Sequence, residues 1–89
     1  MLFRKARDIT VTIKLYSGLH RQLNRGDYNH DSGLTIVVKE HTRLKRLLSS
    51  LGLKNLSAHA YFINGERATL RSRLKSNDEV MCMKPSAGG

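Results

Sequence analysis

Few side chains in this 89-residue sequence could do chemistry of their own. The one cysteine, Cys82, could act as a nucleophile, and the adjacent carboxylates of Asp78 and Glu79 could exchange protons. The candidate metal ligands are the four histidines, His20, His30, His41 and His59. Their spacing fits no short metal-binding motif, so we expect surface or loop histidines and no metal site.

The surroundings of Cys82 favour a structural role for that residue and for the two carboxylates. Cys82 follows Val80 at strand spacing and would share its buried face, so an inert thiol is expected. Asp78 and Glu79 stand where a turn gives way to a strand, which explains both without catalysis. Because no set of nucleophile, base and oxyanion donors is visible, the sequence does not indicate an enzyme.

The end of the sequence offers a different reactive group, the carboxylate of Gly89, which follows residues with small side chains or none. Residues 85–89 read Pro-Ser-Ala-Gly-Gly and have nothing to bury, so we expect a flexible tail. Pro85 stops the strand before it, because proline lacks the ladder N–H and restricts Lys84 to extended conformations. Gly88 and Gly89 lack Cβ atoms, which would let the tail enter a narrow channel.

Two alternating patterns predict strands in the first half of the sequence. Residues 9–16 alternate apolar and polar side chains, and residues 34–39 repeat the same apolar phase. Residues 17–33 between them hold three glycines and many polar side chains. This composition predicts a long loop or an elaborated hairpin connection.

The pattern then changes to the period of a helix. One apolar stripe is formed by Leu44, Leu47, Leu48 and Leu51. Thr42 is the expected N-cap and Gly52 the expected C-terminal stop. Further strands are predicted over 59–64, ending at the turn pair Asn64-Gly65, and over 79–84.

The order strand, strand, helix, strand, strand is the layout of a β-grasp. We therefore expect an α+β fold in which a mixed sheet of four to five strands packs on one main helix. The expected organisation is a single domain over residues 1–84, followed by the flexible tail of residues 85–89.

Composition narrows the classes of partner. The sequence has 16 Lys+Arg against 7 Asp+Glu, a formal charge of +9, which would steer encounters with acidic partners. With five aromatic residues in all, base stacking has little support, so nucleic acid is not expected as a partner. No signal-like segment and no run of roughly 18 apolar residues is present, so a cytoplasmic protein without a membrane partner is expected.

Three segments together resemble the MoaD/ThiS family of ubiquitin-like sulfur carrier proteins. They are the leucine-rich helix end over 47–52, the strand end Ile63-Asn64-Gly65, and residues 74–80 followed by Pro85-Ser86-Ala87-Gly88-Gly89. The resemblance covers about residues 9–89 and implies a ubiquitin-like β-grasp. Ser76-Asn77 replaces the usual Asp-Gly of the family, and asparagine tolerates the left-handed backbone such a turn needs. The strongly basic charge is atypical of the family.

The resemblance also implies the chemistry. A ubiquitin-activating-like enzyme, using ATP and Mg²⁺, would adenylate the Gly89 carboxylate, and a sulfur donor protein would convert it to a thiocarboxylate. Pro85, Ser86, Ala87 and Gly88 would thread the tail into partners. The chain itself would bind no cofactor and act as a carrier, not as an enzyme.

The resemblance implies delivery of sulfur in molybdopterin-type (molybdenum or tungsten) cofactor biosynthesis, to a large synthase subunit. Sulfur carriage for cysteine, thiamine or tRNA thiolation stays open, as do a ubiquitin-like protein modifier and a basic RNA-binding β-grasp module. Met81 and Met83 lie on the strand face opposite Val80 and Cys82, and we expect them to contact a partner. The alternative is that both pack under the 17–33 loop.

Overall fold

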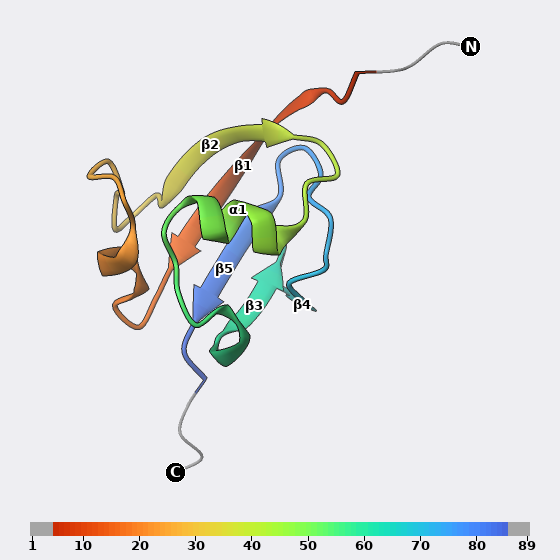
Figure 1. The fold of residues 1–89 in the computed structure, drawn as a ribbon. Coiled ribbons are helices and arrows are strands. Elements are labelled where there is room, and N and C mark those ends of the chain that lie inside the picture. Colours follow the sequence, from red (N-terminus) through yellow and green to blue (C-terminus); the bar gives the residue numbers. More distant parts are fainter. Residues whose placement is uncertain (1–4, 86–89) are drawn as a thin grey trace.

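The sheet is built around the apolar alternation of β1 (Asp8–Leu15). In this computed structural model, which describes residues 5–85, the buried face of β1 carries Ile9, Val11, Ile13 and Leu15. The other strands are β2 (Leu34–Lys39), β3 (Ala60–Ile63), β4 (Glu66–Ala68) and β5 (Glu79–Met83). They form one sheet in the order β2-β1-β5-β3-β4 (Figure 1).

The sheet is mixed, as the sequence predicts. β1 pairs with β2 antiparallel and with β5 parallel, so that Ile13 lies opposite Leu34 on one side and Val80 on the other. β3 pairs antiparallel with both β5 and β4. The sequence patterns predict four of these strands; β4 has three residues, too few to show a period.

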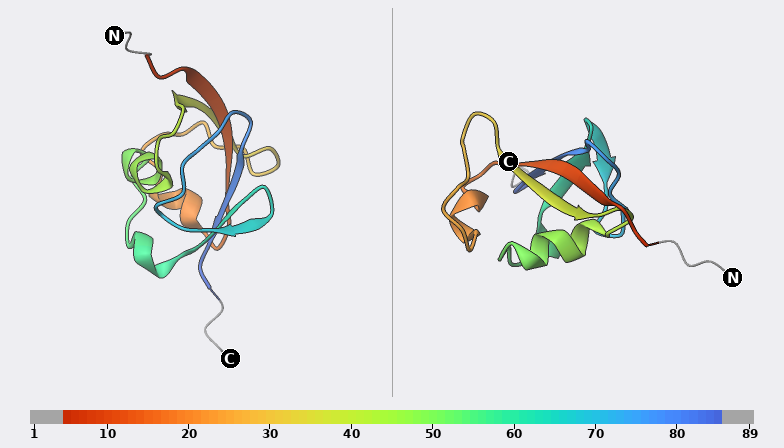
Figure 2. Two further views of the ribbon diagram at one scale, coloured as in Figure 1. Left: turned by 90° about the vertical axis from the view of Figure 1, so that its right-hand side faces the viewer. Right: turned by 90° about the horizontal axis from the view of Figure 1, so that it is seen from above.

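Among residues 5–85 one α-helix, α1 (Leu44–Ser50), is present, and it covers one face of the sheet (Figure 2). Its predicted stripe is confirmed, because Leu44, Leu47 and Leu48 are buried with Leu51 just beyond. A short 3-10 helix, η2 (Leu56–Ala58), precedes β3. Within residues 5–85 no helix has the length and apolar character needed to cross a membrane.

The start of α1 differs from the prediction, because Thr42 is not its N-cap. The Thr42 hydroxyl turns back and donates to the Lys39 carbonyl at 2.7 Å, which closes the turn after β2. The first two helical N–H groups, of Leu44 and Lys45, donate instead to backbone carbonyls in the 70–72 segment, at 2.8 and 3.0 Å. A neighbouring segment thus satisfies donors that a capping side chain normally takes.

The end of α1 matches the prediction. Gly52 has a φ of 97° and follows the C-cap. Its N–H donates to the Ser49 carbonyl at 3.1 Å, and the Leu53 N–H donates to the Leu48 carbonyl at 3.2 Å. These two bonds form a Schellman motif, which glycine favours because its left-handed backbone carries no Cβ penalty.

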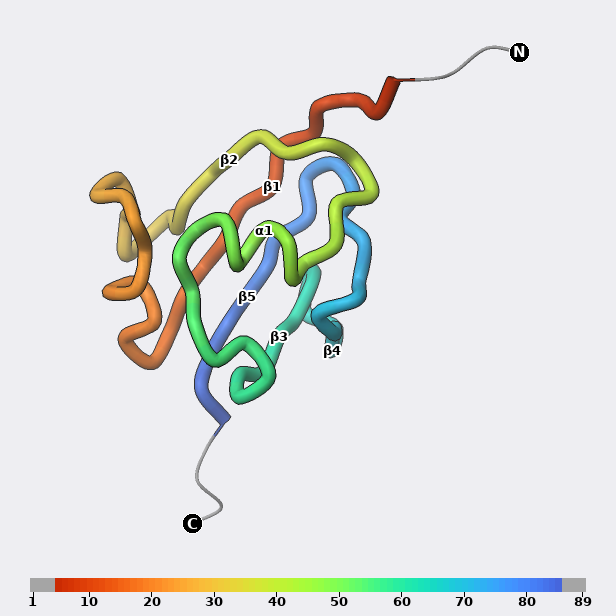
Figure 3. Tube along the Cα trace, in the orientation of Figure 1, coloured from red at the N-terminus to blue at the C-terminus, as the bar shows by residue number. Residues whose placement is uncertain are grey.

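The segment over 17–33 is more than a connection. It contains a 3-10 helix, η1 (Leu19–Gln22), and the Leu19 side chain is completely buried in the core. The Asn24 N–H donates to the Leu51 carbonyl at 3.0 Å, so the segment also packs against the end of α1. The chain trace in Figure 3 shows it beside the β1–β2 pair.

The turn before β5 keeps the backbone geometry expected of it. Asn77, the second residue of the Ser76-Asn77 pair, has a φ of 66°. Its N–H donates to the Thr10 carbonyl at 2.8 Å, and the Asp78 N–H donates to the Lys75 carbonyl at 3.2 Å. Asparagine therefore provides the left-handed residue of this turn, as predicted.

Candidate functional site

The candidate site begins where the chain leaves β5. This strand lies between β1 and β3 at the centre of the sheet, and its end is therefore held from both sides. Beyond it, the Lys84 N–H donates to the Ser17 Oγ at 3.2 Å. Pro85 follows, exposed and outside the strand. The last residue of the ladder is Met83, so the predicted stop at Pro85 fits the structure.

The remaining tail residues that the sequence singles out lie outside the described residues. They are Ser86, Ala87, Gly88 and Gly89. The flexible tail and the reactive Gly89 carboxylate accordingly stay predictions. The structure describes the position from which that tail departs, at the carboxyl end of β5 and next to the carboxyl end of its parallel neighbour β1.

Met81 and Met83 lie on the predicted face of β5. Val80 and Cys82 are completely buried on the helix side, whereas the two methionines are half-buried on the other side. Met81 lies opposite Lys14 of β1 and Phe62 of β3, and directly paired residues share a face of the sheet.

The sheet face away from α1, which we call the open sheet face, mixes apolar and polar groups. By strand register it includes Thr12, Lys14, Thr35, Val37, Phe62 and Met81. Val37 is 64% exposed, although it is a large apolar residue within a strand. The Arg67 guanidinium lies 5.6 Å from the centre of the Phe62 ring. Apolar groups rimmed by polar ones are typical of a protein-binding surface.

Cys82 is a structural residue, as predicted. Its side chain has no exposed surface, and burial raises the pKa of the thiol to about 12. The thiolate is the reactive form, so at neutral pH this group is both inaccessible and protonated.

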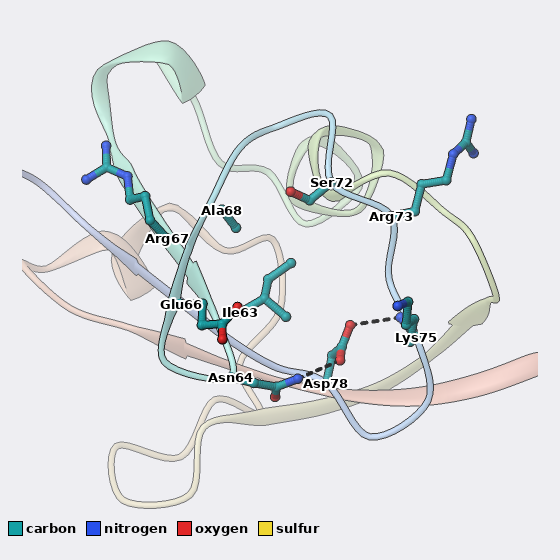
Figure 4. Close-up of a pocket in the computed structure, with 9 residues that line it drawn as sticks. All are labelled: Ile63, Asn64, Glu66, Arg67, Ala68, Ser72, Arg73, Lys75 and Asp78. Carbon is teal, nitrogen blue, oxygen red and sulfur yellow. Dashed lines mark hydrogen bonds between the residues drawn. The ribbon is translucent and has the colours of Figure 1, made fainter.

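The two adjacent carboxylates point to different partners. Both oxygens of the buried Asp78 accept hydrogen bonds of 2.8 Å, one from the Asn64 side-chain amide and one from the Lys75 N–H (Figure 4). Glu79 of β5 lies 3.6 Å from the ammonium of Lys14 on the neighbouring strand β1. Both carboxylates thus join structural elements, at the turn and strand start where the sequence places them.

A pocket of about 370 Å³ lies beside Asp78, between the β3–β4 hairpin and the 72–78 segment. Figure 4 shows its wall, to which Asn64, Glu66, Arg67 and Lys75 contribute. Its buried carboxylate is already satisfied by two hydrogen bonds. The buried carboxylate beside the pocket is therefore engaged by the protein itself.

His41 and His59 lie apart from the other histidines, whereas His20 and His30 contact each other. His59 bonds to the Lys54 carbonyl at 2.9 Å, and His41 lies 3.9 Å from the Glu40 carboxylate. The rings of His20 and His30 lie 4.6 Å apart beside Tyr28, a contact that the irregular 17–33 segment gives no pattern to predict. Over residues 5–85, no three metal-ligating side chains gather.

Comparison with known proteins bears on the fold. No family model and no curated protein matches the sequence. Among solved structures, the chain is similar to SAMP1 from Haloferax volcanii, with 18% identity and a TM-score of 0.61. The match covers 90% of this chain and 99% of that one. Together with the strand order and the helix α1 that covers the sheet, it shows that this chain has a ubiquitin-like β-grasp fold.

Proposed function

We propose that this protein is a ubiquitin-like sulfur carrier whose Gly89 carboxylate is adenylated and then converted to a thiocarboxylate. The sequence resemblance to the MoaD/ThiS carriers supports this, as does the ubiquitin-like β-grasp fold that the chain shares with SAMP1. The sequence resemblance includes the strand that leads into Pro85 and the Gly-Gly at positions 88–89.

The observation that carries the proposal is the position at which β5 ends. The strand is held between two neighbours, and the Lys84–Ser17 hydrogen bond fixes the backbone just beyond it. From there, five residues to Gly89 span at most about 18 Å when extended. A carboxylate on such an arm reaches an active site enclosed within a partner while the folded domain stays outside.

The chemistry needs a partner to start it. A carboxylate is a poor electrophile until one oxygen becomes a good leaving group, which attack on the α-phosphorus of ATP achieves by releasing pyrophosphate. Hydrosulfide (HS⁻) supplied by the sulfur donor then attacks the carbonyl carbon and displaces AMP, which gives the thiocarboxylate with no change of oxidation state. Magnesium and the cationic groups for this step belong to the adenylating enzyme, because this sequence has no phosphate-cradling loop. The chain thus serves as a protein co-substrate.

The open sheet face is the proposed contact surface for the adenylating enzyme. It presents Met81 beside Phe62, with the exposed Val37 two strands away on β2. Methionine adapts its shape to a partner, and aromatic and apolar groups supply most of the energy at protein interfaces. The open sheet face includes Met81 of β5, the strand that leads to the tail. Docking there would therefore bring Gly89 towards the partner's active site.

For the destination of the sulfur, we propose molybdopterin-type cofactor biosynthesis, with a large synthase subunit as acceptor. The family resemblance supports this choice. Carriers for cysteine, thiamine or tRNA thiolation share the same features, and an acceptor of one of those classes is the alternative.

A second candidate function is protein modification, which the likeness to SAMP1, a small archaeal modifier, favours. The same activated carboxyl group would be attacked by a lysine amine instead of a sulfur nucleophile, giving an isopeptide bond. Isopeptide-linked conjugates in the cells of origin would favour this function over sulfur carriage.

The first test of the proposal is the activation step alone. We expect the adenylating enzyme of the same organism to exchange labelled pyrophosphate into ATP only when this chain is present. A variant that lacks Gly89 is the control, because it keeps the folded domain and carries its terminal carboxylate on Gly88, one residue short of the proposed reacting position. Exchange that persists with the shortened variant, or exchange that never occurs, would contradict the proposal.

A further inference from the structure

Residues 43–45 and 70–73, about 30 positions apart in the sequence, meet at the start of α1. The Leu44 N–H at the start of the helix donates to the Ser72 carbonyl at 2.8 Å. This pairing sets Arg43 directly opposite Arg73 in an isolated antiparallel bridge. The backbone pairing therefore places Arg43 and Arg73 side by side in every rotamer of the two side chains.

These arginines line a groove of about 470 Å³ on the helix side of the molecule. Its charged lining, which we call the basic groove, consists of Arg43, Lys45, Arg46 and Arg73. All four side chains are exposed, and none forms an ion pair within residues 5–85. Figure 4 shows the Arg73 side chain directed away from Asp78, the nearby buried carboxylate.

Gathering like charges in this way costs free energy in the isolated protein. Like charges directly opposite each other on paired backbones repel, as Arg43 and Arg73 do. Arg46 stands one helical turn from Arg43 and adds a third cation. An anionic ligand that spans several of these groups would relieve the repulsion.

The lining of the groove favours nucleic acid over an acidic protein. Protein interfaces depend on aromatic or apolar anchors at their centre, and the residues of this groove include no Phe, Tyr, Trp, Leu or Met. The exposed Tyr16 and Val37 lie outside it. Three of its four cations are arginines, whose planar fork binds phosphate through two hydrogen bonds.

We propose that the basic groove binds the phosphodiester backbone of double-stranded nucleic acid. A duplex carries one negative charge per about 1.7 Å of its axis, so several phosphates meet a cluster of cations at once. Single strands fit less well, since base stacking needs the aromatic side chains that the groove lacks. The scarcity of aromatic residues in the sequence argues against base recognition and leaves phosphate binding open. This inference does not depend on the proposed sulfur chemistry.

The test is fluorescence anisotropy with a labelled RNA duplex and a DNA duplex of the same sequence, titrated with the full chain at several salt concentrations. The groove variant is Arg43→Ala/Arg46→Ala/Arg73→Ala. The matched control is Lys14→Ala/Arg25→Ala/Lys39→Ala, which removes the same number of charges from residues that already pair with Glu79, Asp27 and Asp8.

If each arginine contacts one phosphate, the slope of log affinity against log salt should be shallower by about three in the groove variant than in the parent. Between about 50 and 200 mM salt, the parent would then lose roughly 40-fold more affinity than the variant. The control should keep the parent's slope. A preference for the RNA over the DNA duplex would mean that the A-form shape or the 2′-hydroxyls contribute to phosphate binding as well.

Equal losses in the groove variant and the control would overturn the inference, because binding would then follow net charge alone. Polyglutamate that competes with the duplex at equal charge concentration would overturn it in favour of an acidic protein. Far-UV circular dichroism checks that each variant is folded. If the triple variant unfolds, Arg46→Glu on the exposed face of α1 repeats the comparison against Lys14→Glu.

Discussion

The Asn64 side chain joins the β3–β4 turn to Asp78, which precedes β5. Its amide nitrogen donates to Asp78 at 2.8 Å, and its amide oxygen accepts the Glu79 N–H at 2.9 Å. The other Asp78 oxygen accepts the Lys75 N–H at 2.8 Å. One short network therefore ties the hairpin, the preceding turn and the first residue of β5 together, at the opposite end of the strand from the tail.

Asp78→Ala should lower the free energy of unfolding by about 2–3 kcal/mol, because two hydrogen bonds to a buried carboxylate are lost. Urea unfolding measures the change. Asp31→Ala, at an exposed position in the 17–33 segment, is the control and should stay within about 0.5 kcal/mol of the parent. Equal effects of the two substitutions would mean that the network contributes no stability.

Two glycines make a matched pair for backbone strain. At Gly52, where φ is +97°, an added Cβ would lie 2.8 Å from the Gln22 carbonyl oxygen, so Gly52→Ala should destabilise by about 1–3 kcal/mol. At Gly26 nothing lies within 4 Å, so Gly26→Ala should be neutral or stabilise by up to about 1 kcal/mol. Thermal unfolding measures both. A harmless Gly52→Ala would show that the 17–33 segment does not pack against the end of α1.

Cys82 makes stability depend on pH in the alkaline range. Burial raises its pKa to about 12, whereas an unfolded thiol titrates near about 8.5. Its contribution is therefore complete below about pH 8.5 and is lost as the pH rises, by about 1.4 kcal/mol per pH unit up to about 12. We expect the free energy of unfolding to fall more steeply above that lower pH in the parent than in Cys82→Ala. Parallel slopes would contradict the assignment.

The open sheet face is testable through binding to the adenylating enzyme. Met81→Asp places a charge at the centre of that face and should weaken binding at least about tenfold in isothermal titration calorimetry. Ser49→Asp, on the exposed side of α1, adds the same charge to the opposite side and should bind like the parent. Unchanged binding by Met81→Asp would exclude Met81 from the contact surface.

Much of the fold is predictable because its patterns are local. The alternation in β1 and β2, the leucine stripe of α1 and the glycine that ends it all correspond to the structure. The departures depend on distant segments. Thr42 does not cap the helix because carbonyls of the 70–72 segment satisfy the first N–H groups. β4, with three residues, exists through its pairing with β3.

Of the two surfaces, the open sheet face is predictable from local sequence and the basic groove is not. The placement of Met81 and Met83 follows from strand alternation, so the sequence predicts their face correctly. The basic groove is different, since its cations come from α1 and from Arg73, and only the tertiary pairing of these segments brings them together. The scattered basic residues of the sequence give no local sign of such a cluster.

The intact mass of the protein from its own cells, isolated without alkylating or acid treatment, tests most directly whether Gly89 carries sulfur, beside a variant that lacks Gly89. We expect a species heavier by one oxygen-to-sulfur exchange in the parent and its absence from the variant. An unmodified parent mass, even with the adenylating enzyme, ATP and a sulfur donor supplied, would contradict the claim that Gly89 carries sulfur.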